Sequence, residues 1–205
     1  VLDVLRNGRR RCFRLNEEAL SYLKSVPLSP AARGWLLAHS SDQDEEEQPF
    51  VERLDARWPK LSTQQRQAIL SAAAVAAYHA EEDLPRVRLL ICDDAPQFNW
   101  IAEEMALCWV HEGRHYKKLM PLFVHHLQLL SDFQTRFWDY YHQLVAYQQR
   151  PTPEERARLE EGFDRLFSTR SGYDALDRRI AKTWAKKASL LMVLQHPDIP
   201  LHNNP

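Results

Sequence analysis

Two adjacent carboxylates follow a short apolar run in the middle of the chain. Val87 and Leu89 to Cys92 form a nearly continuous apolar stretch that ends at Asp93 and Asp94. Such a stretch is typical of a strand buried on both faces. Carboxylates at the end of a buried strand can hold Mg²⁺ for phosphodiester chemistry, because the strand is rigid and the crevice beyond it opens to solvent. A turn or a helix cap is the alternative role for this pair.

The residues around this pair carry a wider pattern. In the stretch LLICDDAPQFNW, an aromatic residue stands five positions after the first aspartate. The pattern resembles the second-aspartate motif of DDE-type transposases and integrases, which have an RNase H-like core. The resemblance implies that Asp93 is catalytic and ligates Mg²⁺ or Mn²⁺, that Asp94 is its neighbour and the alternative ligand, and that Phe98 packs beneath the aspartate.

Two further motifs extend the resemblance toward the end of the chain. Cys108, His111 and Arg114 match a Cys-x-x-His-x-x-Arg segment that bacterial insertion-sequence transposases of one large family place on the next strand and helix. The closing phrase HPDIPLHNNP is similar to the lead-in to that family's catalytic glutamate, and its motif residues are His202, Asn203 and Asn204. His202 could face the active site or cap a turn.

The resemblance places the other two triad carboxylates outside these 205 residues. In the family the first aspartate lies on a strand upstream of the hairpin, and the glutamate would follow within a few residues of Pro205. We therefore expect a central transposase fragment that is inactive alone and folds poorly without the central strand of its sheet. The complete protein is expected to cleave DNA and transfer strands at the ends of a mobile element.

The expected fold is α/β and predominantly helical, an incomplete RNase H-like core with an N-terminal β-hairpin, two further short strands and a large helical insertion. Asn7-Gly8 predicts the hairpin turn between strands at Val1 to Leu5 and Arg10 to Leu15. We predict a partial core over residues 1–114, with strands near 86–92 and 106–110, a helical insertion over 115–198, and the lead-in over 199–205. The stretch Ala106 to Val110 is also compatible with a helix.

Cap residues and periodicity locate the helices. Asn16, Ser29 and Ser62 each predict a helix start, and the acidic segment Ser40 to Gln48 predicts a mobile surface loop. Aromatic residues recur at helical spacing in the predicted insertion, which favours core packing over a ligand site. They are Phe133, Phe137, Trp138, Tyr140, Tyr141 and Tyr147.

Charge alone does not require a nucleic-acid partner, since 27 basic residues oppose 28 acidic ones for a net charge of −1. Two basic clusters are nevertheless candidate surfaces for double-stranded DNA, both element ends and target. The first comprises Arg114, Lys117 and Lys118, and the second comprises Arg178, Arg179, Lys182, Lys186 and Lys187. The alternative is that these are ordinary solvated helix faces. By analogy with the family, the complete protein is expected to form a homo-oligomer.

The cysteines favour a reducing compartment. Cys12, Cys92 and Cys108 are an odd number and widely spaced, so no disulfide framework is indicated. Neither a signal peptide nor a membrane span is expected, and the predicted location is the bacterial cytoplasm, with the nucleoid as the site of DNA binding. A zinc site of Cys108, His111 and His115 is the alternative to a buried thiol beside hydrogen-bonded imidazoles.

The rival to the enzyme is a non-catalytic helical DNA-binding or protein-interaction remnant of a transposase, in which the strand pair is scaffolding. Other chemistries are disfavoured by motif. The chain contains five glycines and neither a Gly-rich phosphate loop nor a G-x-S-x-G element.

Overall fold

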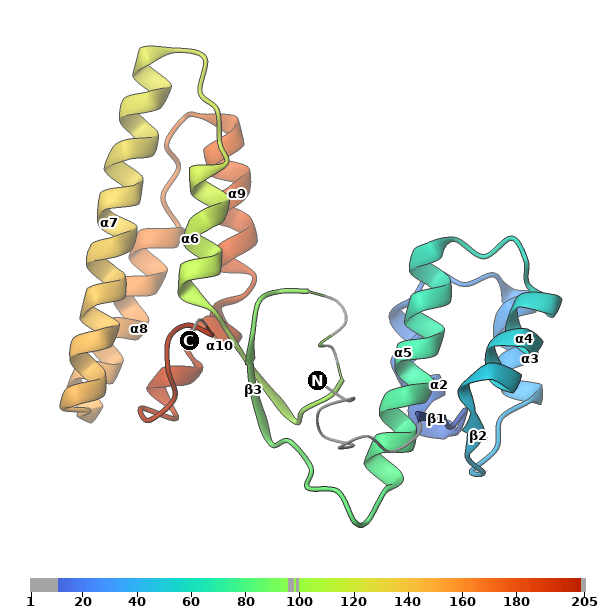
Figure 1. Ribbon diagram of the computed structural model, residues 1–205. Coiled ribbons are helices and arrows are strands. Elements are labelled where there is room, and N and C mark those ends of the chain that lie inside the picture. The colour runs from blue at the N-terminus through green and yellow to red at the C-terminus, as the bar shows by residue number, and fades with distance from the viewer. Residues whose placement is uncertain (1–10, 96–97, 99, 204–205) are drawn as a thin grey trace. The chain divides into compact units, whose positions relative to one another are not determined.

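The computed structural model describes residues 11–95, 98 and 100–203 and is mostly helical, with short strands in two small sheets (Figure 1). The chain forms two compact units. Unit 1 comprises residues 1–88 and 96–103, and unit 2 comprises residues 89–95 and 104–205. This division differs from the predicted boundary at residue 114, because the two strands of the predicted core pair with each other and pack with the helices that follow them.

Three helices of unit 1 begin at the predicted caps. The side chains of Asn16, Ser29 and Ser62 each accept a hydrogen bond from the backbone N–H three residues further on. The backbone N–H of Ser62 in turn donates to the side-chain oxygen of Gln65, which completes a capping box. The elements are β1 (Cys12–Phe13), α2 (Glu17–Tyr22), the 3-10 helix η1 (Leu23–Ser25), α3 (Pro30–Ala38), β2 (Glu45–Glu46), α4 (Glu47–Arg57) and α5 (Thr63–Ala80).

The first strand has a partner that the sequence did not predict. Strand β1 pairs antiparallel with β2, so Glu45 and Glu46 of the predicted mobile acidic loop belong to a sheet. Strand β1 lies within the predicted strand Arg10 to Leu15, whereas the other predicted hairpin strand, Val1 to Leu5, lies outside the described residues. The loop prediction was wrong here because acidic composition indicates solvation but cannot detect a partner strand some 30 residues away.

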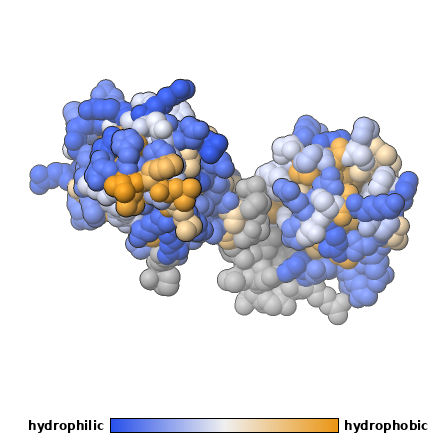
Figure 2. All heavy atoms as spheres, turned by 90° about the horizontal axis from the view of Figure 1, so that it is seen from above, coloured by the Kyte–Doolittle hydropathy of each residue, from blue (hydrophilic) through white to orange (hydrophobic). Residues whose placement is uncertain are grey.

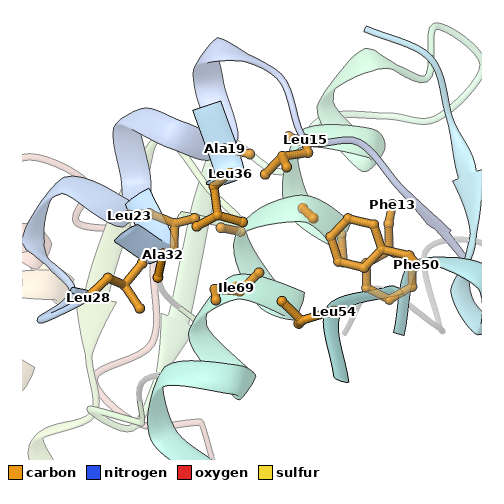
Figure 3. Packing of buried hydrophobic residues seen from close by; sticks show 14 residues of the cluster. Phe13, Leu15, Ala19, Leu23, Leu28, Ala32, Leu36, Phe50, Leu54 and Ile69 are labelled. Atoms are coloured by element: carbon orange, nitrogen blue, oxygen red, sulfur yellow. The ribbon is translucent and has the colours of Figure 1, made fainter. Parts of the chain in front are cut away.

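The core of unit 1 is aliphatic and rich in alanine (Figure 3). Helix α5 contributes Ile69, Ala72, Ala73 and Ala76, whose small side chains let neighbouring elements approach closely. The ring of Phe13 stacks on Phe50 with a centroid separation of 5.2 Å. This packing joins β1, α4 and α5 in one apolar cluster.

Unit 2 opens with a parallel strand pair. Strand β3 (Leu89–Cys92) confirms the predicted strand, and it pairs in parallel with β4 (Glu104–Leu107). The second strand was predicted at residues 106–110 and is correct only in part, since Trp109 already belongs to helix α6 (Trp109–Lys117). The strand ends early because Cys108 caps that helix, its sulfur accepting the N–H of His111 at 3.3 Å.

Helices fill the rest of unit 2. They are α6, α7 (Val124–Gln149), α8 (Pro153–Phe167), α9 (Asp174–Trp184) and α10 (Lys187–Leu190), followed by the 3-10 helix η3 (Met192–Leu194). Helices α6 to α9 form a four-helix bundle in which each contacts two neighbours (Figure 1). The prediction that the aromatic residues pack in the core is confirmed for four of the six, and the other two are half-buried. Phe133, Phe137, Tyr140 and Tyr147 are buried, whereas Trp138 and Tyr141 are half-buried.

One end of unit 2 exposes hydrophobic side chains where α6 passes into α7. Figure 2 looks onto this end and shows a hydrophobic area there. The exposed residues are Met120, Leu122, Phe123, Val124 and Leu127. Within the described part of the chain, none of the helices combines the length and the apolar character needed to cross a bilayer.

Candidate active site

The two predicted carboxylates lie directly after strand β3. The side chain of Asp93 is about two-thirds buried, and its Oδ1 is enclosed without a hydrogen-bond partner among the described residues. Its Oδ2 lies 4.0 Å from Nδ1 of His111, which is too long for a hydrogen bond. Asp94 is half exposed, and its Oδ2 lies 2.5 Å from Nζ of Lys186. The end of the strand therefore carries one carboxylate oxygen that lacks a described partner, on Asp93, and one that is ion-paired, on Asp94.

Both carboxylates open into a cavity of about 490 Å³ within unit 2. Strand β3 supplies the acids, α6 supplies imidazoles, and α9 with the turn after it supplies cations. The cavity is lined by Asp93, Asp94, Ala95, His111, His115, Arg179, Lys182, Ala185 and Lys186. Three of the five residues in the second predicted basic cluster thus line the same cavity as the predicted metal ligand.

Behind the cavity lies a buried carboxylate, Glu112, whose side chain is only 3% exposed. It pairs with Arg179, accepts the Thr183 hydroxyl at 2.6 Å, and lies 3.2 Å from Nζ of Lys186. The Tyr116 hydroxyl shares a 2.5 Å bond with Thr183. Lys186 therefore bridges the buried Glu112 and the exposed Asp94.

Burial, hydrogen bonds and neighbouring charges shift the pKa values of groups in and behind the cavity. Burial raises the pKa of Glu112, but the Thr183 hydroxyl and the Arg179 guanidinium outweigh it, so the net pKa lies below the usual value. Burial lowers the pKa of His115, and nearby Arg179 lowers it further. Burial, reinforced by Asp93 and Asp94, raises the pKa of Cys92 to about 11. Glu112 is therefore anionic at neutral pH, and the Cys92 thiol is protonated.

The residues fit a divalent cation in part. Asp93 Oδ1 is a buried carboxylate oxygen that lacks a donor, and hard cations bind such oxygens while retaining waters. No group of three His, Cys, Asp or Glu side chains within the described residues is arranged to hold a metal ion. Any ion at Asp93 would therefore need ligands beyond those described.

The three residues of the alternative zinc site do not all line the cavity. The Cys108 sulfur is buried and serves as the helix cap, and the rings of His111 and His115 lie edge to face with centroids 5.5 Å apart. His111 and His115 face the cavity, and Cys108 is not among its lining residues.

The remaining predicted basic residues lie away from this cavity. Arg114, Lys117 and Lys118 are exposed at the surface of α6 and its end. Arg178 lines a different hollow with Asp174 and Asp177, and Nζ of Lys187 lies 2.5 Å from Asp164. Arg178 to Lys187 were predicted to form one surface, but α9 ends at Trp184 and α10 begins at Lys187, so these residues point in different directions.

The motif-supporting residues have mixed outcomes. Phe98 is half-buried and belongs to unit 1, so its packing beneath Asp93 stays a prediction. The Trp109 N–H donates to the Leu201 carbonyl at 2.9 Å, which docks the predicted lead-in beside the start of α6. His202 is half-buried, and its enclosed Nδ1 has no hydrogen-bond partner in the described part of the chain; Asn203 is exposed. Asn204 lies outside the described residues.

Sequence reasoning missed Glu112 and Thr183. Glu112 shares the buried face of α6 with Trp109, Gly113 and Tyr116. An acid three residues after one aromatic and four before another lies on the apolar stripe, and this spacing could have indicated a buried charge in need of partners.

Comparisons with known proteins give little functional information. The chain is 31% identical over 203 residues to a Sinorhizobium fredii (strain NBRC 101917 / NGR234) protein named "Uncharacterized protein y4jO". Neither a family model nor a solved structure matches. The aligned region covers 99% of this chain, and the chain spans 62% of the length of that curated relative.

Proposed function

We propose that the complete protein is a DDE-type transposase that cleaves DNA and transfers strands in a metal-dependent reaction, and that Asp93 is one of its metal ligands. The observation that carries this proposal is the placement of Asp93. A parallel strand ends directly before this residue, and one of its carboxylate oxygens is buried with no donor among the described residues. Its side chain lines a cavity that also exposes cations. Strand ends of this kind are rigid supports for phosphoryl-transfer sites.

Backbone contacts add support. The Cys108 N–H donates to the Cys92 carbonyl at 2.9 Å, and the next residue, Trp109, donates to Leu201. These bonds bring the end of β3, the start of α6 and the segment before Asn203 together. An RNase H-like core requires such an approach, because its last carboxylate follows that segment in the family that the sequence resembles.

The proposal assigns separate tasks to the side chains. Asp93 binds the ion, and Asp94 is the alternative ligand. The other two carboxylates of the triad belong to segments outside the 205 residues. Mg²⁺ or Mn²⁺ bound at Asp93 would polarise the scissile phosphate and activate the attacking water or 3′ hydroxyl. Lys182 and Lys186 line the cavity and supply a sequence-independent attraction for DNA phosphate that weakens with salt.

Replacing Asp93 in the full-length protein tests this proposal. Asp93→Asn should lower cleavage of a plasmid carrying the element ends at least about a hundredfold, since a metal ligand supplies several kcal/mol of transition-state stabilisation. DNA binding should persist. Asp139→Asn, an exposed change on α7, is the matched control. Cleavage by Asp93→Asn at the rate of this control would refute the assignment.

A non-catalytic interaction role is the second candidate. The exposed hydrophobic side chains between α6 and α7 favour it, since contiguous apolar surface often marks a protein-binding site. On this reading neither Asp93→Asn nor Asp139→Asn changes function, and Leu122→Ser abolishes partner binding. On the enzyme reading, Asp93→Asn alone removes cleavage. A homo-oligomer, proposed by analogy for the complete enzyme, is compatible with both.

A further inference from the structure

Two residues that line the cavity each carry a buried polar atom without a partner among the described residues, and the two atoms are of opposite kinds. Oδ1 of Asp93 is an acceptor without a donor, and Nε of Arg179 is a donor without an acceptor. Both residues line the same cavity. Because buried polar groups are nearly always hydrogen-bonded, unsatisfied atoms on two side chains of one cavity indicate that a ligand is needed to complete both sets of contacts. A phosphate carrying a bound cation has this character, since the cation suits the carboxylate and a phosphate oxygen suits the guanidinium.

The guanidinium of Arg179 is held in place from behind. Glu112 accepts a hydrogen bond from its Nη2, and the ring of Tyr116 lies 5.9 Å from its central carbon. The side chain of Arg179 is only 13% exposed. Glu112 is in turn fixed by the Thr183 hydroxyl. A guanidinium held this way on one edge has a rigid planar fork and is prepared to bind phosphate without a search through rotamers.

The charged side chains in and behind the cavity already balance without a ligand. Arg179, Lys182 and Lys186 are matched in number by Asp93, Asp94 and the buried Glu112. A phosphodiester entering alone would meet a cavity with no surplus positive charge. With a divalent cation at Asp93, the same cavity becomes attractive to an anion.

We infer that Arg179 binds a backbone phosphate of the DNA strand held at Asp93, that Glu112 is the positioning residue for this contact, and that the contact depends on a divalent cation. The inference rests on the proposed function and adds to it the phosphate-binding residue, its support and the coupling to metal. A purely structural role for the Glu112, Arg179 and Lys186 cluster is the competing explanation.

The test measures binding of a short fluorescein-labelled DNA duplex by fluorescence anisotropy over a range of salt concentrations, with Mg²⁺ and with EDTA. The full chain should bind more tightly with Mg²⁺. Arg179→Gln should weaken binding in Mg²⁺ about tenfold or more and reduce the slope of log affinity against log salt by about one, as expected for one lost phosphate contact. Arg158→Gln makes the same charge change on an exposed part of α8 and should leave both quantities unchanged.

Arg179→Lys guards against a folding defect because it retains the charge beside Glu112. Lys lacks the planar fork and the Nε donor, so its affinity in Mg²⁺ should fall while its far-ultraviolet circular dichroism matches the parent protein. Glu112→Gln should weaken Mg²⁺-dependent binding in the parent background and have little further effect in the Arg179→Lys background, since the two act through one contact.

The outcomes separate the inference from the proposed function. If the full chain binds DNA more tightly with Mg²⁺ and both Arg179 variants behave like Arg158→Gln, Arg179 is structural and the inference is overturned while the proposed function stands. An equal effect of Glu112→Gln in both backgrounds removes Glu112 as the positioning residue. If the full chain fails to bind DNA with or without Mg²⁺, both proposals are overturned.

Discussion

The two units of this chain differ in the kinds of side chain that they bury. Unit 1 packs aliphatic side chains and alanines around α5, and its described ion pairs lie near the surface, such as Arg66 with Asp55 at 2.7 Å. Unit 2 packs rings around Trp109, whose Nε1 donates to the Leu190 carbonyl at 2.8 Å, and it also buries the charged Glu112. Hydroxyl and indole groups inside unit 2 thus find partners. In unit 1 the buried Tyr78 hydroxyl also donates to the Pro85 carbonyl, but Nε1 of Trp58 is buried without a partner among the described residues.

This difference identifies where function is expected. A buried ionised group is costly and persists only with well-placed partners, and replacing such a group by an apolar one is often neutral or stabilising. Stability alone gives unit 2 little reason to retain Glu112 beneath a cavity that exposes Asp93 and Asp94. A network of this kind can hold neighbouring side chains in one geometry, as a binding site requires.

The largest expected effect comes from removing the buried charge. Glu112→Ala should lower the free energy of unfolding of unit 2 by about 3–5 kcal/mol, because the largely buried Arg179 would lose its carboxylate and Lys186 would keep only Asp94. Hydrogen exchange followed by mass spectrometry at increasing urea would report each unit through its own peptides.

The matched change in unit 1 is Asp55→Ala, which breaks an ion pair whose carboxylate side chain is 45% exposed. It should cost at most about 1 kcal/mol, because water and salt screen the pair. Equal effects of the two substitutions would remove the contrast between the units.

The next comparison uses one helical glycine from each unit. A Cβ at Gly113 would lie 2.7 Å from Cζ2 of Trp138, so Gly113→Ala should destabilise unit 2 by about 1–3 kcal/mol as the ring is displaced. A Cβ at Gly34 in α3 would meet nothing within 4 Å. Gly34→Ala should therefore stabilise unit 1 by up to about 1 kcal/mol through helix propensity. Thermal unfolding of both variants checks the opposite signs, and a stabilising Gly113→Ala would show that α6 and α7 pack more loosely than described.

The smallest expected effect is a dependence of unit 1 on pH. Burial raises the pKa of Glu18, but hydrogen bonds from Tyr22 and His79 outweigh it, so the net pKa is lowered. The stabilisation from Glu18 is therefore complete above the unfolded-state value near pH 4.5 and is lost as the pH falls through the folded-state value.

The effect should remain below about 1 kcal/mol because the carboxylate is partly solvated. Urea unfolding between pH 3 and pH 7 measures it, and Glu18→Gln should flatten the part of the curve below about pH 4.5. An unchanged curve for this variant would show that other carboxylates control the acid response of unit 1.

Local features were predictable because their causes are local. Asn16, Ser29 and Ser62 cap their helices as expected, since a cap needs only a side-chain oxygen and a backbone N–H three residues later. The apolar run at Leu89–Cys92 indicated a strand for a similar reason, and it placed Asp93 at the strand end. The predominantly helical α/β composition followed from the same periodicities.

Tertiary structure alone decided which distant residues meet. The pairing of β1 with β2 and the contact of Glu112 with Arg179, 67 residues later, leave no local mark in the sequence. Among the basic residues from Arg178 to Lys187, the packing of α9 and of the turn after it decides that Arg179, Lys182 and Lys186 line the cavity. Propensities and caps act over about one helical turn, whereas burial and charge pairing act through space. The sequence by itself therefore determined the capped helices and the position of Asp93 after its strand, and packing determined what surrounds Asp93.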